Sequence, residues 1–232
     1  MNYGFFISTY HPSKNYVGKD DIIKCVESIR RYHPDAPIII VDSDSKDLEY
    51  INHVKKFNVT VDLAKNKHRS TGMIWHAYDN YDEFDFYYFL HDGHKVNDKI
   101  TDALDYDIST IRYFNSHNGL ARTRRGREYG FSPNGSYPYE SRDWCKNMLE
   151  THTPYRLPDL FTGVSYSVFF CKRSVLEKME RSGMKNILPL NKNQDQSMER
   201  VWGVALEQAG YDLKENSYIN TEKIHKTHRV RK

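Results

Sequence analysis

The sequence predicts an α/β fold in which a mostly parallel sheet is flanked by helices. Strand-like and helix-like segments alternate over the first third of the 232 residues, and the expected strands are near-continuous apolar runs. Parallel strands are connected through helices, and strands that are apolar on both faces are typical of a sheet covered on both sides. The length favours a single domain, residues 1–232, because one core can grow to roughly 250 residues before it divides.

Each element of the first third follows from its residue pattern. Residues 3–10 (YGFFISTY) form an apolar run typical of a buried strand. Residues 19–33 carry apolar side chains at helical spacing and predict a helix. The same two patterns predict a strand over 36–45 (APIIIVDSDS), a helix over 45–57, a strand over 58–64, a helix over 71–81 and a strand that opens the stretch 84–96 (FDFYYFLHDGHKV).

The later part of the chain is less regular. Residues 115–160 are rich in Asn, Gly, Arg, Pro and Tyr and predict a long connection that contains one helix, over 141–152. Residues 162–183 predict a strand that leads into a helix, and residues 194–211 predict a further helix. The segment 217–224 (SYINTEKI) predicts an extended strand.

Composition excludes several classes of protein. The net charge of +3 is small and spread along the chain, so we expect no nucleic acid as a partner. The three cysteines are far apart in sequence, which predicts neither a disulfide framework nor a zinc site and favours a reducing compartment. No leader opens the chain, and no apolar run approaches the roughly 18 residues that span a bilayer. We therefore expect a cytoplasmic protein, attached to a membrane, if at all, only from outside.

Three polar clusters follow the expected strands: STYHP (8–12), DSDS (42–45) and HDGH (91–94). The carboxyl ends of parallel strands meet at one edge of a sheet, where such sheets bind ligands. The chain has neither a GxGxxG fingerprint nor a GxxxxGK[ST] loop, so a nucleotide would be held in another way. A carboxylate at a strand end, here Asp92, could bind Mn²⁺ or Mg²⁺, which bridges a diphosphate and neutralises its charge. The neighbouring imidazoles suit Mn²⁺ at least as well as Mg²⁺.

Six segments carry a resemblance that spans nearly the whole chain. They are FISTY, IIIVDSDS, NKHRSTGMIWHAYDNY, FYYFLHDG, FTGVSYSVFF and MERVWGVALEQAGYD. In their order and rough spacing the chain resembles a GT-A-type nucleotide-sugar glycosyltransferase, of the small single-domain kind found in bacteria and large DNA viruses. The resemblance implies a Rossmann-like GT-A fold, with a nucleotide-binding half over 1–114 and an acceptor and catalytic half over 115–232. It also implies metal-dependent sugar transfer from a nucleotide-sugar donor, a UDP-sugar, to a hydroxyl of a glycan or glycoprotein.

The resemblance assigns the strand ends to the nucleotide. The residues expected at the base or the diphosphate are Ser8, Thr9, Tyr10, His11, Asp42 and Arg69. Tyr10 or His11 would stack on the base, and Asp42 would accept a hydrogen bond from uracil N3–H. Gly163 would let the backbone approach the donor sugar closely. Without the resemblance, Asp42 is interpreted as capping its own turn and Arg69 as a surface charge.

The metal motif of that family is DxD, and this sequence departs from it. Asp92 is the acidic member, while Gly93 or His94 stands where a second Asp is expected. We expect Asp92 and His94 as ligands, and the resemblance implies a third ligand from a His near the C-terminus. On an extended strand His225 and His228 point in opposite directions, so at most one of them coordinates, and we choose His225.

An inverting member of this family needs a carboxylate base that takes the proton from the acceptor hydroxyl. Such a base commonly begins the helix that follows the acceptor loop. Asp195 and Glu199 lie four residues apart there and share one helix face. Glu199 is closer to the family's acidic position, so we expect it to be the base and Asp195 to cap the helix. In a retaining enzyme Glu199 would instead orient the acceptor.

Two other functions stay open from the sequence. A sugar-phosphate nucleotidyltransferase shares this kind of sheet, but it normally carries a glycine-rich loop with Arg or Lys directly after the first strand. The segment STYHPSKNYVGK lacks that density of glycine. The imperfect DxD motif also allows a catalytically silent binding domain that has kept the fold and lost the metal.

Overall fold

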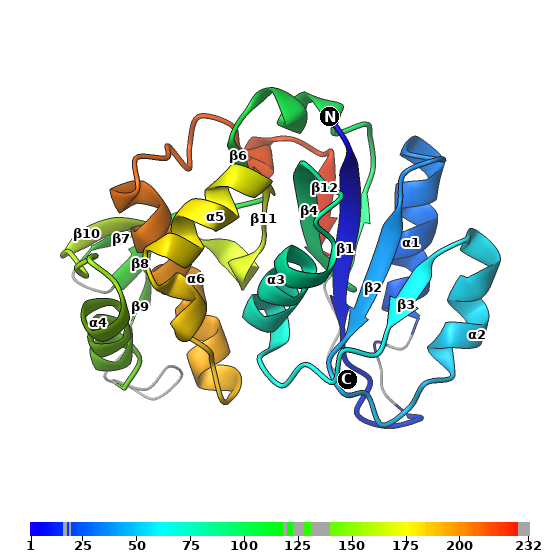
Figure 1. The fold of residues 1–232 in the computed structure, drawn as a ribbon, viewed down its shortest axis with the longest axis horizontal. Coiled ribbons are helices and arrows are strands. Elements are labelled where there is room, and N and C mark those ends of the chain that lie inside the picture. Colours follow the sequence, from blue (N-terminus) through cyan, green and yellow to red (C-terminus); the bar gives the residue numbers. More distant parts are fainter. Residues whose placement is uncertain (16–17, 19, 118–119, 123–127, 131–139, 227–232) are drawn as a thin grey trace.

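The computed structural model describes residues 1–232 apart from 16–17, 19, 118–119, 123–127, 131–139 and 227–232. Its largest sheet contains β1 (Tyr3–Thr9), β2 (Ile38–Asp42), β3 (Thr60–Asp62), β4 (Phe86–His91), β6 (Ile108–Thr110) and β11 (Phe169–Lys172). These strands lie in the order β3-β2-β1-β4-β11-β6 (Figure 1). The pairs β1–β2, β1–β4 and β2–β3 are parallel, while β11 runs antiparallel to both β4 and β6. The prediction of a mostly parallel α/β sheet is confirmed.

Helices flank both faces of this sheet. They are α1 (Asp21–Tyr32), α2 (Tyr50–Val54), α3 (Arg69–Asn80), α4 (Glu140–His152), α5 (Arg173–Arg181) and α6 (Lys192–Gln208). In β4, Tyr87 and Phe89 join the core cluster that includes residues of α3, α5 and α6, whereas Phe86, Tyr88 and Leu90 join the cluster that includes residues of α1. The apolar run is continuous because side chains alternate between two faces that are both buried. Within the described part of the chain, none of the helices is long and apolar enough for a membrane crossing.

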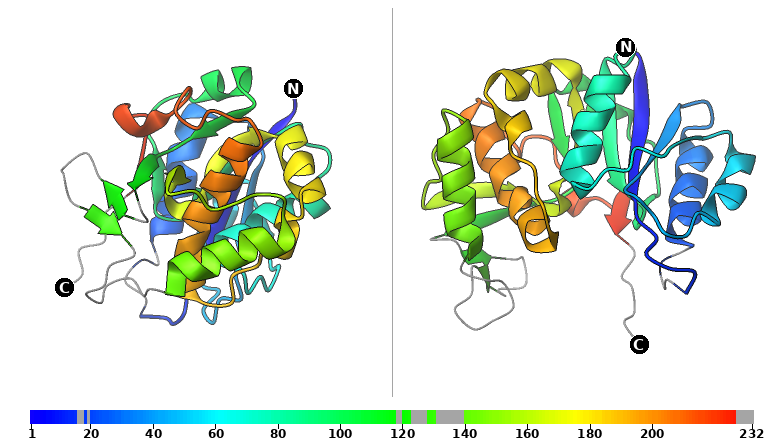
Figure 2. Two further views of the ribbon diagram at one scale, coloured as in Figure 1. Left: turned by 90° about the vertical axis from the view of Figure 1, so that its left-hand side faces the viewer. Right: turned by 60° about the horizontal axis from the view of Figure 1, so that its bottom comes forward.

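Two smaller sheets complete the fold. A four-stranded antiparallel sheet has the order β10-β7-β8-β9 and consists of β7 (Tyr113–His117), β8 (Leu120–Arg122), β9 (Glu128–Gly130) and β10 (Leu160–Val164). A two-stranded sheet pairs β5 (His94–Val96), directly after β4, with β12 (Ile224–Lys226) near the C-terminus. In both views of Figure 2, α4 lies alongside α6, with which it is in contact.

The later part of the chain departs from the sequence prediction. Besides the predicted helix α4, it contains the strands β8 and β9, where only a connection was expected. The strand expected from residue 162 divides into β10 and β11, which belong to different sheets. Between them, Tyr166 and Ser167 have φ of 66° and 52°, in the left-handed region that turns the chain. No glycine marks this turn, so the residue pattern predicted a continuous strand.

The strand order reverses at β1, and this reversal positions the site. The chain passes outward from β1 to β2 and β3 and then returns to β4 on the other side of β1. A crevice forms at the carboxyl ends of the strands where such an order reverses, and ligands bind there. Backbone hydrogen bonds continue past the strand ends: Ser43 N donates to Thr9 O at 2.9 Å, and Asp92 N donates to Ser8 O at 3.1 Å. The three turns at the crevice are therefore tied to one another.

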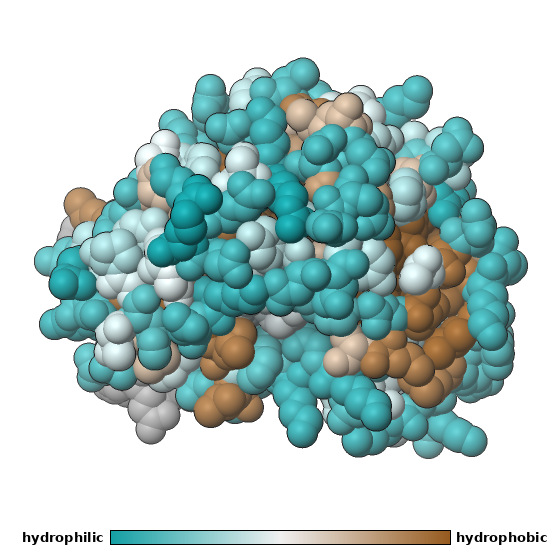
Figure 3. Space-filling view, viewed as in Figure 1, coloured by the Kyte–Doolittle hydropathy of each residue, from teal (hydrophilic) through white to brown (hydrophobic). Residues whose placement is uncertain are grey.

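Apolar surface gathers on the side of the molecule where α2 and β3 lie (Figure 3). Leu48 and Leu63, which flank these elements, are 41% and 48% exposed. β3 is an edge strand of only three residues, so few backbone groups at this edge of the sheet are left unpaired.

β10 and α6 pack backbone to backbone. A Cβ on Gly203 would overlap the carbonyl oxygen of Thr162 and would lie 2.7 Å from Cα of Gly163. A Cβ on Gly163 would overlap the ring of Phe114. Gly203 therefore lets the helix and the strand approach closely, and Gly163 leaves space for the ring of Phe114.

We expect Gly203→Ala to lower the free energy of unfolding by about 1–3 kcal/mol, although alanine favours a helix by about 1 kcal/mol over glycine. The overlapped atoms belong to the backbone of β10, which cannot rotate away. Urea denaturation followed by circular dichroism measures the change. The control is Asn193→Ala, at an exposed position in the first turn of the same helix, which should change stability by less than about 0.5 kcal/mol. Equal stability of Gly203→Ala and the wild type would mean that the two elements separate at little cost.

Candidate active site

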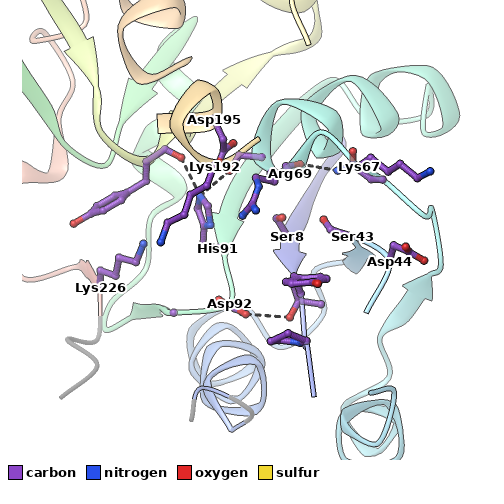
Figure 4. Close-up of a pocket in the computed structure, with 17 residues that line it drawn as sticks. Ser8, Ser43, Asp44, Lys67, Arg69, His91, Asp92, Lys192, Asp195 and Lys226 are labelled. Carbon is purple, nitrogen blue, oxygen red and sulfur yellow. Dashed lines mark hydrogen bonds between the residues drawn. The ribbon is translucent and has the colours of Figure 1, made fainter. Parts of the chain in front are cut away.

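A cavity of about 880 Å³ opens in the crevice at the carboxyl ends of β1, β2 and β4 (Figure 4). Its wall comes from the turns after these strands, the starts of α3 and α6, the turn between β10 and β11, and the end of β12. A cavity of this volume holds a ligand of cofactor size.

The end of β1 supplies two of the predicted residues, Ser8 and Thr9, and the turn after it supplies Tyr10; all three line the cavity. Tyr10 is 40% exposed, so its ring is accessible to a ligand. His11 is buried, and its ring packs on Tyr50 with the ring centroids 4.6 Å apart. The structure thereby separates the two stacking candidates, because Tyr10 reaches the cavity and His11 packs inside the turn.

Asp42 holds its own turn and does not line the cavity. It is 2% exposed; Oδ1 accepts a hydrogen bond from Ser45 N at 2.8 Å, and Oδ2 accepts one from the Tyr50 hydroxyl at 2.8 Å. Burial and the adjacent carboxylate raise the pKa of Tyr50. Asp42 therefore caps its own turn, which is the role expected of it when the family resemblance is left aside. The following residues, Ser43 and Asp44, line the cavity instead.

Arg69 begins α3, and its guanidinium extends into the cavity (Figure 4). Its φ of 52° is left-handed. Asn66 stabilises this conformation, since Nδ2 donates to Arg69 O at 2.6 Å and Oδ1 accepts from His68 N at 2.8 Å. A Cβ on Gly72 would overlap the Asn66 side chain, so the glycine provides the space that this turn needs.

The turn after β4 connects several walls of the cavity. His91 and Asp92 line it, and Thr9 Oγ1 donates to Asp92 Oδ2 at 3.0 Å. His91 Nε2 lies 3.0 Å from Ser70 Oγ and 2.9 Å from Tyr166 O. β4 is thus joined to β1, to the start of α3 and to the turn between β10 and β11.

The residues predicted as metal ligands are not brought together. His94 is 1% exposed, its Nδ1 accepts a hydrogen bond from His91 N at 2.9 Å, and burial lowers the pKa of its imidazole well below the usual range. His225 lines a separate surface depression, and the alternation along β12 turns Lys226 into the cavity instead. His228 lies outside the described residues. Within those that are described, no group of three or more His, Cys, Asp and Glu residues could hold a metal ion.

α6 brings Asp195, and not Glu199, to the cavity wall. The helix is capped by Asn191, whose side chain accepts hydrogen bonds from the backbone amides of Asn193 and Gln194, each at 3.0 Å. The expectation that Asp195 caps the helix is therefore wrong. Asp195 lies in the first turn and faces the crevice from the side opposite to β1 and β2 (Figure 4).

Burial raises the pKa of Asp195 to about 6, because the charged carboxylate loses contact with water. The positive charge of Arg69, the backbone amide of Ser70 and the charges of Lys226 and Lys192 oppose this rise. Among the described residues, Oδ1 of Asp195 is buried without a hydrogen-bond partner. The carboxyl group can therefore change protonation near neutral pH.

Glu199, one turn farther along α6, acts on the backbone. Its Oε1 accepts a hydrogen bond from Tyr166 N at 3.0 Å, within the left-handed turn between β10 and β11. Burial raises the pKa of Glu199, while the charge of the adjacent Arg200 opposes the rise. Gly163, predicted at the donor sugar, is also absent from the cavity wall and packs between Phe114 and α6.

Lys192, Tyr166 and Lys226 are among the residues of the cavity wall that the sequence reasoning missed. Lys226 could have been predicted, because it follows His225 on an extended segment and its side chain therefore points to the opposite face. Lys192 would have followed from assigning Asn191 as the helix cap. Nothing in the local sequence indicates the turn at Tyr166.

Charge and strain both concentrate at the cavity. The charged residues in its wall are Lys67, Arg69, Lys192, Lys226, Asp44, Asp92 and Asp195. Three lining residues, Asp44, Arg69 and Tyr166, have left-handed φ of 64°, 52° and 66°. Side chains other than glycine adopt this conformation at a cost, and such strain clusters at functional sites. The wall therefore suits an anionic ligand that reacts beside a carboxylate.

Comparison with known proteins shows the fold of the chain. No protein-family model and no curated protein sequence matches it. Among solved structures, a synthetase for CMP-2-keto-3-deoxy-manno-octonic acid in complex with CTP aligns at a TM-score of 0.52 with 14% identity, over 94% of this chain and 89% of that one. A cytidylyltransferase from Leptospira borgpetersenii aligns at 0.52 with 13% identity, over 96% of this chain and 78% of that one. The chain therefore has the α/β architecture of these two structures.

A looser likeness extends to TarS from S. aureus. The structure of TarS 1–349 in complex with UDP aligns at a TM-score of 0.46 with 14% identity, over 84% of this chain and 53% of that one. The chain spans about half the length of that fragment and a third of the longer TarS structure.

We expect Asp195→Asn to stabilise the protein at pH 8, by on the order of 1–2 kcal/mol after allowance for partial exposure of the side chain. The pKa of Asp195 is raised from 3.8 to about 6, so the folded state binds the proton more tightly than the unfolded state. This contribution to stability is present below about pH 4 and is lost as the pH rises through about 6.

Denaturation curves at pH 4.5 and pH 8 provide the measurement, with pH values chosen on either side of about 6. The gain for Asp195→Asn should be larger at the higher pH. Asp143→Asn, on the exposed surface of α4, is the matched control and should shift neither curve. A gain that is the same at both pH values would contradict the assigned pKa.

Proposed function

We propose that this protein is a glycosyltransferase that moves a sugar from a nucleotide-sugar donor, a UDP-sugar, to a hydroxyl of a glycan or glycoprotein. The observation that carries the proposal is Asp195, a carboxyl group with a pKa of about 6 in the wall of a cavity that is also lined by cations. The cavity is large enough for a nucleotide with its sugar.

The base of the donor is assigned to the side of the cavity formed by the turns after β1 and β2. The accessible ring of Tyr10 offers a stacking surface, and Ser8, Ser43 and Asp44 offer hydrogen-bonding groups beside it. Asp42 has no direct part in this assignment, because its carboxylate oxygens are engaged by Ser45 and Tyr50. Its contribution is to fix the turn that presents Ser43 and Asp44.

Asp195 is assigned as the general base. An acceptor hydroxyl must lose its proton as its oxygen attacks the anomeric carbon, and a carboxylate with a pKa near the working pH suits this transfer. Glu199 is assigned a positioning role, because its carboxylate is bonded to Tyr166 N and is not part of the cavity wall. An inverting reaction is favoured, since a single carboxylate then takes the proton directly.

The same observation favours glycosyl transfer over nucleotidyl transfer to a sugar phosphate, although nucleotidyl transfer to a sugar hydroxyl would also use a base. The nucleophile of a sugar-phosphate nucleotidyltransferase is a phosphate that is already ionised at neutral pH. Such a nucleophile has no need of a carboxylate base and would be repelled by Asp195. The fold likeness to cytidylyltransferases keeps nucleotidyl transfer as the second candidate, because those structures cover most of this chain.

The described residues do not fit the predicted metal site. Of the three expected ligands, Asp92 lines the cavity, His94 is buried behind it and His225 faces a separate depression. Asp92 also accepts a hydrogen bond from Thr9 Oγ1. No step of the reaction is therefore derived through Mn²⁺ or Mg²⁺.

Release of a nucleoside diphosphate from a panel of nucleotide sugars tests the function, since background hydrolysis by water needs no acceptor. We expect release from at least one UDP-sugar, and a loss of about 10²–10⁴-fold in Asp195→Asn, as removal of a general base predicts. Asp143→Asn should retain full activity. Pyrophosphate release from a nucleoside triphosphate with a sugar phosphate would support the nucleotidyltransferase, and UDP binding without either reaction would support a silent binding domain.

The pH dependence of kcat/KM tests the identity of the base. We expect the rate to rise with pH through about 6, as Asp195 loses its proton in the field of Arg69, Lys192 and Lys226. The residual activity of Asp195→Asn should lack this inflection, whereas Glu199→Gln should keep it. An inflection that survives in Asp195→Asn and disappears in Glu199→Gln would return the role of base to Glu199.

A further inference from the structure

Three cations from separate elements extend into the cavity. Arg69 comes from the start of α3, Lys192 from the start of α6, and Lys226 from β12 (Figure 4). Lys67 also belongs to the wall, but in this view its amine points away from the other three. All three line the cavity, and all three are close enough to lower the pKa of Asp195.

A feature of the fold places each of the three at the cavity. The strained backbone of Arg69 is held by Asn66, whose Nδ2 donates to Arg69 O at 2.6 Å. Lys192 is the first residue of α6 and directly follows the cap Asn191, so it lies at the positive end of the helix dipole. The ammonium of Lys226 lies 3.9 Å from the ring centroid of Tyr166, a cation–π contact, and the pairing of β12 with β5 fixes its strand.

The arrangement provides what a departing diphosphate needs. In glycosyl transfer, the bond between the anomeric carbon and the β-phosphate oxygen breaks, and its electron pair remains on that oxygen. The acceptor oxygen forms the new bond to the anomeric carbon and gives its proton to Asp195. Negative charge on the diphosphate therefore grows during the step, and preorganised cations at that position lower the barrier.

We propose that Arg69, Lys192 and Lys226 form a diphosphate cradle that binds the donor and stabilises the leaving group without a divalent cation. The proposal rests on the proposed function for the identity of the ligand as a nucleotide sugar. It departs from the expectation that a metal ion at Asp92 neutralises this charge. Asp92 instead ties the turn after β4 to β1 through its hydrogen bond with Thr9.

The side chains in the cavity wall favour binding of the diphosphate without a metal ion. Mg²⁺ and Mn²⁺ favour carboxylate and other oxygen ligands, and one carboxylate of the predicted set, Asp92, reaches the cavity. The remaining charges on the diphosphate side are ammonium and guanidinium groups, which repel a divalent cation and attract phosphate oxygens. Two further carboxylates line the cavity: Asp195, whose burial disfavours its charged form, and Asp44, which lies in the turn assigned to the base.

Isothermal titration calorimetry with two probes, UDP and inorganic pyrophosphate, tests the cradle. Titrations are made in EDTA and repeated with Mn²⁺. We expect the wild type to bind UDP in EDTA with an affinity that Mn²⁺ changes by less than about threefold. Loss of a charge-assisted contact should weaken UDP and pyrophosphate by about tenfold or more in Lys192→Ala and in Lys226→Ala.

Matched variants separate charge from structure. Lys192→Arg and Lys226→Arg keep the charge and should retain most of the affinity. Lys146→Ala removes a charge from the exposed surface of α4 and should bind both probes like the wild type. Circular dichroism establishes that each variant is folded.

The outcomes distinguish the cradle from the function on which it rests. UDP and pyrophosphate binding that requires Mn²⁺ and is lost in Asp92→Asn would overturn the cradle and leave the transferase standing. Metal-free pyrophosphate binding that depends on the two lysines, with no binding of UDP, would support the cradle and contradict the UDP-sugar donor. Absence of binding with and without Mn²⁺ would contradict both.

Discussion

The parallel pairing of β1 with a strand on each side is the constraint on which the site depends. In this register Thr9 stands opposite Asp42, and Ser8 stands opposite His91. All three strands therefore end at the same edge, and the turns that follow them must share one space. The hydrogen bond from Thr9 to Asp92 then joins two of these turns directly. Local residue chemistry decides what each turn presents, but the strand register decides that the turns meet.

The second wall of the cavity depends on a different interaction. The chain turns between β10 and β11 through Tyr166, whose left-handed backbone is unfavourable for a residue with a side chain. Glu199 accepts a hydrogen bond from its backbone N, and His91 Nε2 lies 2.9 Å from its carbonyl oxygen. A buried carboxylate on α6 and an imidazole at the end of β4 thus hold one strained residue between them. Through Tyr166, α6 is linked to the parallel sheet, and Asp195 is carried by the same helix.

The electrostatics of the cavity couple the carboxylate to the cations. Burial disfavours the charged form of Asp195, whereas Arg69, Lys192 and Lys226 favour it, and the balance leaves its pKa at about 6. The same cations are available to an anionic ligand. A bound diphosphate would partly neutralise them and would make the carboxylate a stronger proton acceptor. Binding of the donor and the proton affinity of Asp195 would then be coupled electrostatically.

The sequence by itself determined the α/β class, the main helices and the parallel strands, because continuous apolar runs and helical spacing are local patterns. It also predicted that Ser8, Thr9, Tyr10 and Asp92 would lie at one edge, since strand ends converge in any such sheet, whereas Arg69 was expected there only from the family resemblance. Tertiary structure decided which polar residues of each cluster face the ligand. Asp42 and His94 turn inward because other buried groups engage them, His225 faces outward through strand alternation, and Asp195 rather than Glu199 reaches the cavity. Apart from the strand alternation at His225, which is a local pattern, these choices depend on partners that are distant in sequence, above all on the turn at Tyr166.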